Sequence, residues 1–349
     1  MRVLFSPDMF VMQRVGGITR YFSELQAGLR ESGVDADIFG GLHSNKYIAS
    51  HRMKSLSRMS GSKRLHLSRG AFTAYALAQR GRQIVHPTYY TAHPIPGRHP
   101  HVCTFYDLIH LRYAHLFPPN DIVDRQRFWA HRADRLIAIS NATADDMVSL
   151  LHVPRSKITV IHLGTHVPAQ QERKNPEDYL LYVGTRDRYK NWSIVVEALC
   201  ARELSDLRLI CCGGGAPTQE ETQLLKNRRL WHRVEFVQAD DETLNRIYQR
   251  AVALVYPSLY EGFGLPPLEA MARGVPVVAA RTSSLPEVVG DAALLFDPSE
   301  LEAVVHAISR LLDATTRKEF ERRGRQRAKM FPWSRTVQQT MDVYRDLLV

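Results

Sequence analysis

The first half of the chain alternates short apolar runs with amphipathic stretches. The earliest run, residues 3–6, is typical of a buried strand, and a loop with Gly16 and Gly17 follows it. Apolar residues then recur at helical spacing at Ile18, Phe22, Leu25 and Leu29. Further strands are expected over residues 34–39, 84–85, 102–105, 136–139 and 158–162. Strands that alternate with helices pair in parallel, so this half predicts a doubly wound α/β sheet.

A polar stretch over residues 164–178 interrupts this pattern and is typical of a linker between domains. The pattern then restarts with a helix over residues 193–199 among strands over residues 179–183, 207–212, 234–237, 253–256, 275–279 and 293–296. We therefore predict two Rossmann-like domains, residues 1–168 and 169–330, facing each other across a ligand cleft. A last helix is expected within residues 331–349.

Composition agrees with two globular domains. The chain has 349 residues, of which 44% are hydrophobic and 23% are charged. We expect no signal peptide, because Pro7 and Asp8 cut the first apolar run, and no apolar run reaches the roughly 20 residues that span a bilayer. A cytoplasmic protein is therefore expected. The cysteines form no CxxC pair, so buried, reduced thiols are expected at Cys103, Cys200, Cys211 and Cys212.

The formal net charge is +10, and the excess is unevenly distributed. Residues 38–106 contain no Asp or Glu, although they hold Lys46, Arg52, Lys54, Arg58, Lys63, Arg64, Arg69, Arg80, Arg82 and Arg98. Such a run favours an anionic partner, either a membrane surface, a nucleic acid or a phosphorylated substrate, and a solvated basic face without a partner is the alternative. No nucleic-acid-binding motif is present, so no nucleic acid is expected as a partner.

The segment over residues 257–276 (PSLYEGFGLPPLEAMARGVP) carries the clearest chemistry. A loop with Glu261 follows a strand, and Pro266 and Pro267 suit the first turn of a helix, in which Glu269 is also expected. Glycines let backbone N–H groups approach a ligand, and two carboxylates suit the vicinal hydroxyls of a polyhydroxylated ligand. A capped helix in which Glu269 only stabilises the helix dipole is the alternative.

EGFGLPPLE followed by A-x-x-x-G-V-P-V-V-A resembles the E-x(7)-E region of family 4 glycosyltransferases, which have the GT-B fold and retain anomeric configuration. The resemblance extends over nearly the whole chain. It includes the GGITRY start, ADRLIAISNATADDM, VIHLG, YLLYVGTRDRYKN and TLNRIYQRAVALVYPS. It implies two Rossmann-like domains of the GT-B type and a last helix, residues 331–349, that crosses back to pack on the N-terminal domain.

The resemblance also implies roles for residues of the C-terminal half. Glu261 would contact the transferred sugar and Glu269 the ribose, while Lys190 matches the family's lysine that holds the leaving diphosphate. Fixed cations suit this step because the leaving diphosphate gains negative charge. Many members have arginine directly after the glycine; here Gly184 is followed by Thr185, and the arginine is Arg186. Arg188 is a further candidate cation. The remaining expected donor contacts are Gly184, Thr185, Val237, Gly262, Phe263, Gly264 and Leu265.

In the N-terminal half, Gly16 and Gly17 precede a helix, whose N-terminus favours phosphates. The resemblance implies that they contact the diphosphate or sugar, and an ordinary tight turn is the alternative. Many relatives carry histidine before the aspartate of TFYDLIHLRY, where this chain has Tyr106. Tyr106 or His110 is a candidate for a related polar role, and Asp107 for positioning the loop. Arg20 and Tyr21 are further candidates for lining the cleft.

No metal or cofactor is expected, since the cations would replace a metal. Asp35-Ala36-Asp37 has the form of a metal-binding D-x-D, but it falls inside a predicted strand and is interpreted as structural. The resemblance to bacterial surface-polysaccharide mannosyltransferases favours GDP-mannose as the donor and a glycan or lipid-linked oligosaccharide as the acceptor, and the acid-free stretch over residues 46–98 suits an anionic membrane. A UDP-sugar or dTDP-rhamnose donor, a non-catalytic sugar-nucleotide-binding subunit and a dinucleotide-dependent oxidoreductase are the alternatives.

Overall fold

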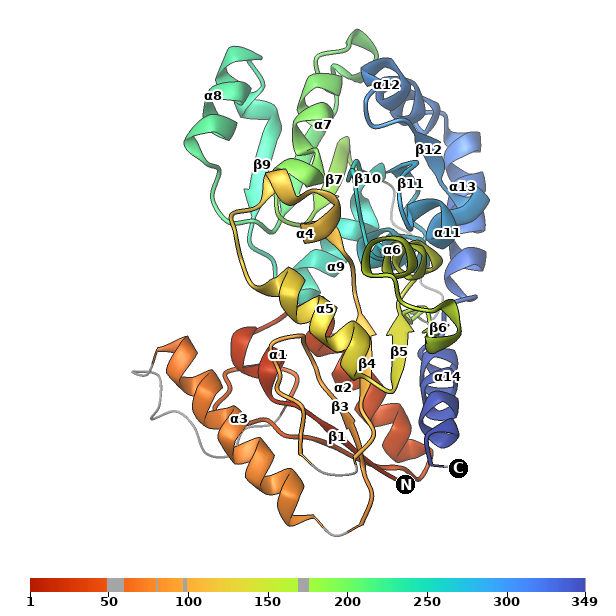
Figure 1. The fold of residues 1–349 in the computed structure, drawn as a ribbon. Coiled ribbons are helices and arrows are strands. Elements are labelled where there is room, and N and C mark those ends of the chain that lie inside the picture. The colour runs from red at the N-terminus through yellow and green to blue at the C-terminus, as the bar shows by residue number, and fades with distance from the viewer. Residues whose placement is uncertain (49–59, 80, 97–98, 169–175, 349) are drawn as a thin grey trace. The chain divides into compact units, whose positions relative to one another are not determined.

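The computed structural model describes residues 1–48, 60–79, 81–96, 99–168 and 176–348. The chain divides into two units (Figure 1). The first consists of Met1–Gly164 together with Trp333–Val349, and the second of Thr165–Pro332. The C-terminal segment therefore belongs to the first unit, although the whole second unit precedes it in the sequence.

The first unit holds two parallel three-stranded sheets, in the orders β2-β1-β3 and β4-β5-β6. A single bridge from Val85 to His101 links β3 to the segment before β4. The strands are β1 (Arg2–Phe5), β2 (Asp35–Ile38), β3 (Ile84–His86), β4 (Val102–Phe105), β5 (Arg135–Ala138) and β6 (Ile158–Val160). All lie within two residues of the predicted strands, because their short apolar runs leave few alternatives.

The helices of the first unit are α1 (Asp8–Met12), α2 (Gly17–Glu31), α3 (Gly61–Ala78), α4 (Ile109–Arg112), α5 (Ile122–Arg132), α6 (Asn141–Leu151) and α14 (Trp333–Asp346). α14 packs on α2 (Figure 1). An added Cβ at Gly28 of α2 would lie 2.5 Å from Val337 Cγ2 of α14, so this glycine permits a close helix contact. α6 begins at Asn141 with Ser140 as its cap, three residues earlier than predicted, and Thr143 lies inside the helix.

The second unit has one parallel six-stranded sheet in the order β12-β11-β10-β7-β8-β9. The strands are β7 (Tyr179–Val183), β8 (Arg208–Cys212), β9 (Val234–Val237), β10 (Ala253–Tyr256), β11 (Val277–Ala280) and β12 (Leu294–Phe296). The order reverses between β7 and β10, which are neighbours in the sheet. In doubly wound sheets this switch point, at the carboxyl ends of the strands, is where ligands bind.

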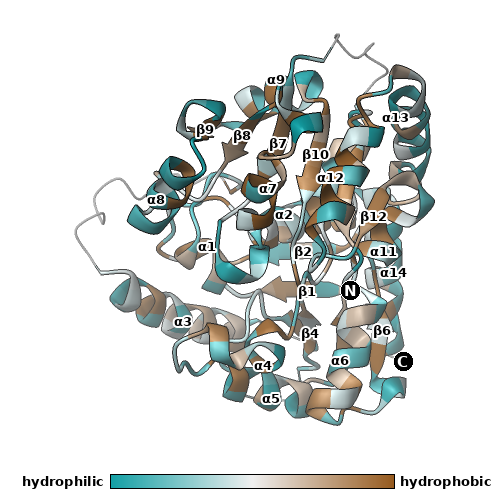
Figure 2. Ribbon diagram, turned by 90° about the horizontal axis from the view of Figure 1, so that it is seen from above, coloured by the Kyte–Doolittle hydropathy of each residue, from teal (hydrophilic) through white to brown (hydrophobic). Residues whose placement is uncertain are grey.

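The helices of the second unit are α7 (Trp192–Ala198), α8 (Gln219–Asn227), α9 (Asp241–Arg250), α10 (Leu265–Ala272), α11 (Leu285–Val289), α12 (Leu301–Arg310) and α13 (Ala314–Ala328). β10 and β11 are buried along their whole length, as expected of strands covered on both faces. Figure 2 shows the contrast between apolar strands such as β10, in brown, and the largely polar α13, in teal.

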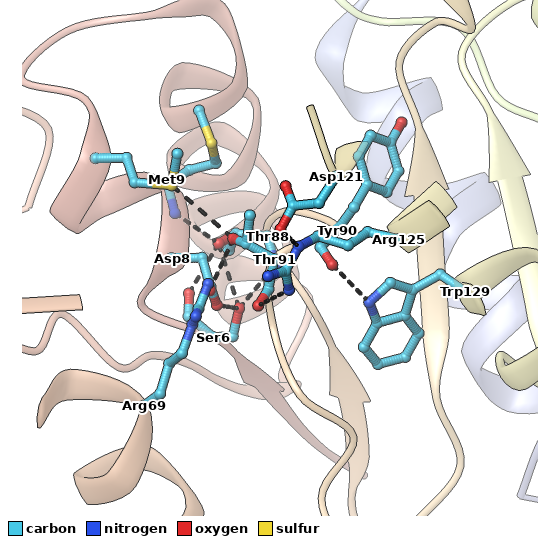
Figure 3. Close-up of polar contacts among 11 residues, drawn as sticks. Ser6, Asp8, Met9, Arg69, Thr88, Tyr90, Thr91, Asp121, Arg125 and Trp129 are labelled. Carbon is cyan, nitrogen blue, oxygen red and sulfur yellow. Dashed lines mark hydrogen bonds and ion pairs between the residues drawn. The ribbon is translucent and has the colours of Figure 1, made fainter. Parts of the chain in front are cut away.

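A buried ion pair lies at the carboxyl end of the first sheet (Figure 3). The Asp8 side chain is fully buried and accepts hydrogen bonds from Ser6 Oγ at 2.6 Å, Arg69 Nε at 2.8 Å and Thr91 Oγ1 at 3.1 Å. Ser6 also contacts Thr88, whose N–H donates to Ser6 Oγ at 3.0 Å. These bonds connect α3 and the segment after β3 to the end of β1. They also pair the Arg69 guanidinium with a buried carboxylate.

One expectation from the sequence is wrong and another is confirmed. Cys200 is exposed, because it follows α7 in a surface turn, whereas Cys103, Cys211 and Cys212 are buried free thiols. The acid-free stretch contains α3, which the charge run did not reveal; Arg52, Lys54, Arg58, Arg80 and Arg98 lie outside the described residues. The D-x-D segment forms β2, where Asp37 accepts from Tyr75 Oη at 2.9 Å, so its role is structural.

A fully buried histidine connects α14 to the first sheet. His86 Nδ1 lies 2.6 Å from Tyr344 Oη, and His86 Nε2 lies 2.9 Å from Thr104 Oγ1. Burial without a charged partner disfavours the imidazolium, so the pKa of His86 is lowered to about 3.

This burial makes the stability of the protein depend on pH. The folded chain keeps His86 neutral, whereas the unfolded chain protonates it below about pH 6.5, so the free energy of unfolding falls by up to about 1.4 kcal/mol per pH unit from there down to about pH 3. We expect the stability difference between the wild type and His86→Gln, measured by urea denaturation, to shrink as the pH falls from 7 to 4. A difference that stays constant over this range would contradict the prediction.

Candidate functional site

Two loops meet at the switch point of the second sheet. One follows β7 and carries Gly184 to Lys190, and the other follows β10 and carries Glu261. The Leu259 N–H donates to the Tyr189 carbonyl at 2.8 Å, so the backbones of the two loops are in contact. Because β7 and β10 are neighbours, residues 71 positions apart in sequence are brought together here.

Lys190 and Glu261 form an ion pair at this point. Lys190 Nζ lies 2.6 Å from Glu261 Oε1, and each side chain is only 13% exposed. The ammonium also lies 5.1 Å from the centre of the Tyr189 ring and 5.7 Å from that of Tyr256. The pair therefore offers a cation and a carboxylate side by side, largely shielded from water.

Tyr256, the last residue of β10, holds the same carboxylate. Its phenol is buried and hydrogen-bonded to Glu261, and burial together with the charge of Glu261 raises the pKa of Tyr256 well above its usual range. The phenol therefore stays protonated and can donate to Glu261 at any physiological pH. The sequence analysis did not single out Tyr256, although its position at the end of a strand beside the motif marks it as a candidate.

α10 begins directly after the β10 loop. Gly264 caps the helix at a φ of +107°, and an added Cβ would lie 2.8 Å from Leu285 Cδ2, so only glycine suits this position. Pro266 and Pro267 lie in the first turn, as predicted. Glu269 is the fifth helical residue and is half-buried, so it lies beyond the first turn; a role confined to the dipole of that turn is thereby disfavoured. Gly262 and Phe263 are buried, and Leu265 is the first helical residue.

The loop after β11 also contacts the Glu261 segment. Ser283 Oγ accepts from the Glu261 N–H at 2.8 Å, and Ser284 Oγ donates to the carbonyls of Glu261 and Phe263 at 2.8 and 3.0 Å. These serines were missed in the sequence, where their signal is their place directly after a strand that neighbours β10.

Arg186 is hydrogen-bonded to protein groups rather than to Glu261. Its Nε donates to Glu221 Oε1 at 2.8 Å, and its Nη1 and Nη2 donate to the carbonyls of residues 213–216. The guanidinium also lies 4.7 Å from the centre of the Phe236 ring, and the side chain is 2% exposed. Its described hydrogen bonds thus go to Glu221 on α8 and to carbonyls of the turn after β8, whereas Arg188, two positions before Lys190 in the sequence, is exposed.

The other expected donor contacts surround the same edge of the sheet. Gly184 has a φ of +137° and its N–H donates to the Cys212 carbonyl at 2.9 Å. Thr185 is exposed, and its Oγ1 donates to Asp187 Oδ2 at 2.6 Å. Val237 ends β9, and its carbonyl accepts from the Gly213 N–H at 3.1 Å. Backbone groups of all three therefore lie at the carboxyl ends of β7 and β9.

In the first unit, Gly16 and Gly17 open α2. Gly16 is the extended cap residue, and its carbonyl accepts from Thr19 Oγ1 and from the Arg20 N–H, both at 3.0 Å. Gly17 is the first helical residue and is exposed. The predicted loop followed by a helix is confirmed, and the Gly17 N–H lies among the first amides of that helix. Tyr21 is buried in α2, and burial raises its pKa to about 12.

Tyr106, Asp107 and His110 follow β4. Tyr106 is buried, with its Oη donating to the Thr88 carbonyl at 3.1 Å, so the structure places it in the core rather than at a polar surface. Asp107 Oδ1 accepts from the Ile109 N–H at 3.2 Å, which agrees with a loop-positioning role. The His110 ring, on α4, packs 4.2 Å from the Phe117 ring, centre to centre, and its buried Nδ1 has no hydrogen-bond partner among the described residues.

Comparisons with known proteins agree with this architecture. Residues 15–167 match the model of "Glycosyltransferase Family 4", and residues 166–327 match that of "Glycosyl transferases group 1". The chain is 31% identical to O-antigen chain mannosyltransferase B of Escherichia coli over 296 residues, which cover 78% of this chain and 76% of the relative. This chain therefore belongs to glycosyltransferase family 4.

Solved structures show the same fold. Sucrose-phosphate synthase of Thermosynechococcus elongatus superposes with a TM-score of 0.76 at 22% identity, covering 99% of this chain and 98% of the other. The Anabaena HepE protein, solved in complex with UDP-glucose, superposes with a TM-score of 0.73 at 16% identity, covering 99% of this chain and all (100%) of the other. The fold is thus that of the GT-B glycosyltransferases, with two Rossmann-like domains.

The contacts of Arg186 predict a large effect on stability. Arg186→Ala should lower the free energy of unfolding by about 3 to 5 kcal/mol, because it leaves the Glu221 carboxylate and several carbonyls without their buried partner. Arg188→Ala, an exposed arginine two positions away, should change it by less than about 0.5 kcal/mol. Urea denaturation of both variants checks this, and equal stabilities would show that Arg186 does not fasten the turn after β8.

Proposed function

We propose that this chain is a retaining, metal-independent mannosyltransferase. It would move mannose from GDP-mannose to a glycan or lipid-linked oligosaccharide of a bacterial surface polysaccharide. The observation that carries the proposal is the pair of Lys190 and Glu261 at the switch point of the second sheet. The mannose donor rests on the similarity to O-antigen chain mannosyltransferase B.

The pair supplies what the reaction needs. When the donor binds, Lys190 would exchange Glu261 for the diphosphate, and Glu261 would accept hydrogen bonds from hydroxyls of the sugar. The bond between C1 and the phosphate oxygen then breaks, and the cation stabilises the negative charge that develops on the leaving diphosphate. The acceptor oxygen bonds to C1 on the same face, and its proton passes to the departing phosphate oxygen.

The second cation for the diphosphate and the residue that binds the ribose are proposed from the exposure and contacts of the candidate side chains. Arg188 is the second cation that we propose, because it is exposed two positions before Lys190 in the sequence, whereas the guanidinium of Arg186 is bonded to Glu221 and to carbonyls of the turn after β8. Glu269, half-buried on α10, would bind the ribose hydroxyls. Gly262, Phe263 and Gly264 would contribute backbone groups near the phosphates, as the tight approach of the loop at Gly264 allows.

The nucleotide preference is tested by thermal stabilisation in the presence of EDTA. GDP at ~100 times its dissociation constant should add about 2.7 kcal/mol to the free energy of unfolding, whereas UDP and dTDP at the same concentration should add little. Selective stabilisation by UDP, the nucleotide of the Anabaena complex, or by dTDP would contradict GDP-mannose as the donor. The assignment as a glycosyltransferase would still hold. Loss of the GDP effect in EDTA would contradict metal independence.

Catalysis is tested with Glu261→Gln, which keeps the shape of the side chain but removes its charge. We expect transfer from GDP-mannose to fall at least a hundredfold, roughly the loss seen when one transition-state contact is removed. Binding of GDP should remain, because Glu261 would contact the sugar and not the nucleotide. An unchanged rate of donor turnover would favour the alternative of a non-catalytic binding subunit, and NMR of the product anomer checks retention.

We also propose that α3 attaches the first unit to an anionic membrane. Within the described ranges, none of the helices combines the length and apolar character that crossing a bilayer needs. The outward side of α3 instead carries Leu67 and Leu77, each 53% exposed, together with exposed Lys63 and His66. Residues 38–106 contain no acid to repel anionic lipid, and each cation near such a surface contributes about 1 kcal/mol.

Vesicle co-sedimentation tests this attachment. Lys63→Glu combined with Arg64→Glu should weaken binding to phosphatidylglycerol vesicles at least tenfold, and salt should weaken the wild type in the same direction. Lys318→Glu combined with Lys329→Glu, exposed lysines of the second unit, is the matched control and should bind as the wild type does. Equal binding by the two double variants would exclude α3 as the contact. Arg69 is left intact because it is paired with Asp8.

A further inference from the structure

Ser283 has a backbone conformation that serine rarely adopts. Its φ is +45°, in the left-handed region that favours glycine, and it lies in the loop between β11 and α11. A non-glycine residue in this region costs of order 1 to 3 kcal/mol of conformational strain, so such residues persist where a contact requires them. The left-handed conformation of Ser283 is therefore expected to allow a contact of its side chain, which glycine would lack.

The side chain of Ser283 makes that contact. Its Oγ accepts the Glu261 N–H at 2.8 Å, while Ser284 Oγ, which is fully buried, donates to the Glu261 carbonyl at 2.8 Å. Thr282 Oγ1 donates to the Ser258 carbonyl at 2.8 Å, at the start of the same loop. Three successive hydroxyls thus hold the segment from Ser258 to Phe263, and both backbone groups of Glu261 are engaged.

The carboxylate of Glu261 is fixed as well, by Lys190 and by the phenol of Tyr256. Of these contacts, those with Ser283 and Ser284 are made to the backbone of Glu261 and do not involve its carboxylate. The backbone that carries Glu261 is therefore held by groups other than the partners of its side chain.

We propose that Ser283 and Ser284 are positioning residues, which set the orientation of the Glu261 carboxylate toward the transferred sugar. This inference rests on the proposed function, in which Glu261 contacts the sugar. The strained conformation of Ser283 is then retained because it lets the hydroxyl oxygen accept a hydrogen bond from the Glu261 amide. Glycine would remove the strain and lose the contact, so the stability should be kept while the activity falls.

The test compares Ser283→Gly, Ser283→Ala and Arg229→Gly. Both Ser283 variants lose the acceptor, but only Ser283→Gly relieves the strain. Arg229 is exposed and has a φ of +58° in the same unit, away from the β10 loop, so Arg229→Gly is a matched control for strain relief alone. Melting temperature, the kinetics of sugar transfer and the dissociation constant of GDP are measured for each variant.

We expect Ser283→Gly to melt no lower than the wild type and Ser283→Ala to melt lower. Both should show kcat reduced about tenfold, the effect of losing one hydrogen bond, with the KM for the donor and the dissociation constant of GDP within twofold of the wild type. Arg229→Gly should keep the wild-type kcat. A kcat for Ser283→Gly equal to that of Arg229→Gly would overturn the proposal, since a merely structural residue leaves the folded enzyme's kcat unchanged.

Hydrogen–deuterium exchange separates this inference from the proposed function. Ser283→Gly should take up deuterium faster than the wild type over residues 259–264, and Arg229→Gly should not. If Ser283→Gly exchanges faster but the wild type transfers sugar from no donor, the proposed function is refuted. The role of Ser283 in holding the Glu261 backbone is then still supported. Unchanged exchange over these residues would refute the positioning role whatever the activity.

Discussion

The ion pair of Lys190 and Glu261 depends on one property of the second unit, the reversal of strand order between β7 and β10. Each strand delivers its loop to the same edge of the sheet, and the two loops carry charges of opposite sign. Because β7 and β10 are parallel neighbours, their carboxyl ends lie at one edge, and the sheet brings together residues far apart in sequence. Within the second unit, the cap at Gly264 follows one of these loops, and the hydroxyls of the β11 loop bind the same loop.

Two charges that are mostly shielded from water need partners, because removing an ion from water costs several kcal/mol. In this structure each charge provides the other's partner, and the phenol of Tyr256 provides another for the carboxylate. Such a site is prepared for a ligand that carries both a diphosphate and hydroxyls, since that ligand can take over both roles at once. Arg186 shows the contrasting case: its described hydrogen bonds go to Glu221 on α8 and to carbonyls of the turn after β8, and its charge is partnered within the fold.

The strands and the motif residues could be predicted because apolar runs and glycine positions are local signals. β7, β9 and β10 lie where the pattern placed them, and Pro266 and Pro267 start α10 as expected. The partners of the side chains could not be predicted, because they depend on which strands become neighbours. The sequence offers no sign that Arg186 meets Glu221, that Tyr106 is buried, or that Ser283 accepts the amide of Glu261. The exposed Cys200 was missed for a similar reason, since the turn that exposes it has no apolar pattern.

The position of α14 makes the second unit an insertion into the first. The chain leaves the first unit after Gly164 and returns at Trp333, and the two passages run side by side, with the Thr165 N–H bonded to the Phe331 carbonyl at 2.8 Å. A ribosome therefore finishes the second unit before it has made the last element of the first. Until α14 is synthesised, His86 lacks its tyrosine and α2 lacks its cover at Gly28. A frameshift that replaced α14 would therefore expose a buried histidine and a helix face that were both synthesised near the N-terminus.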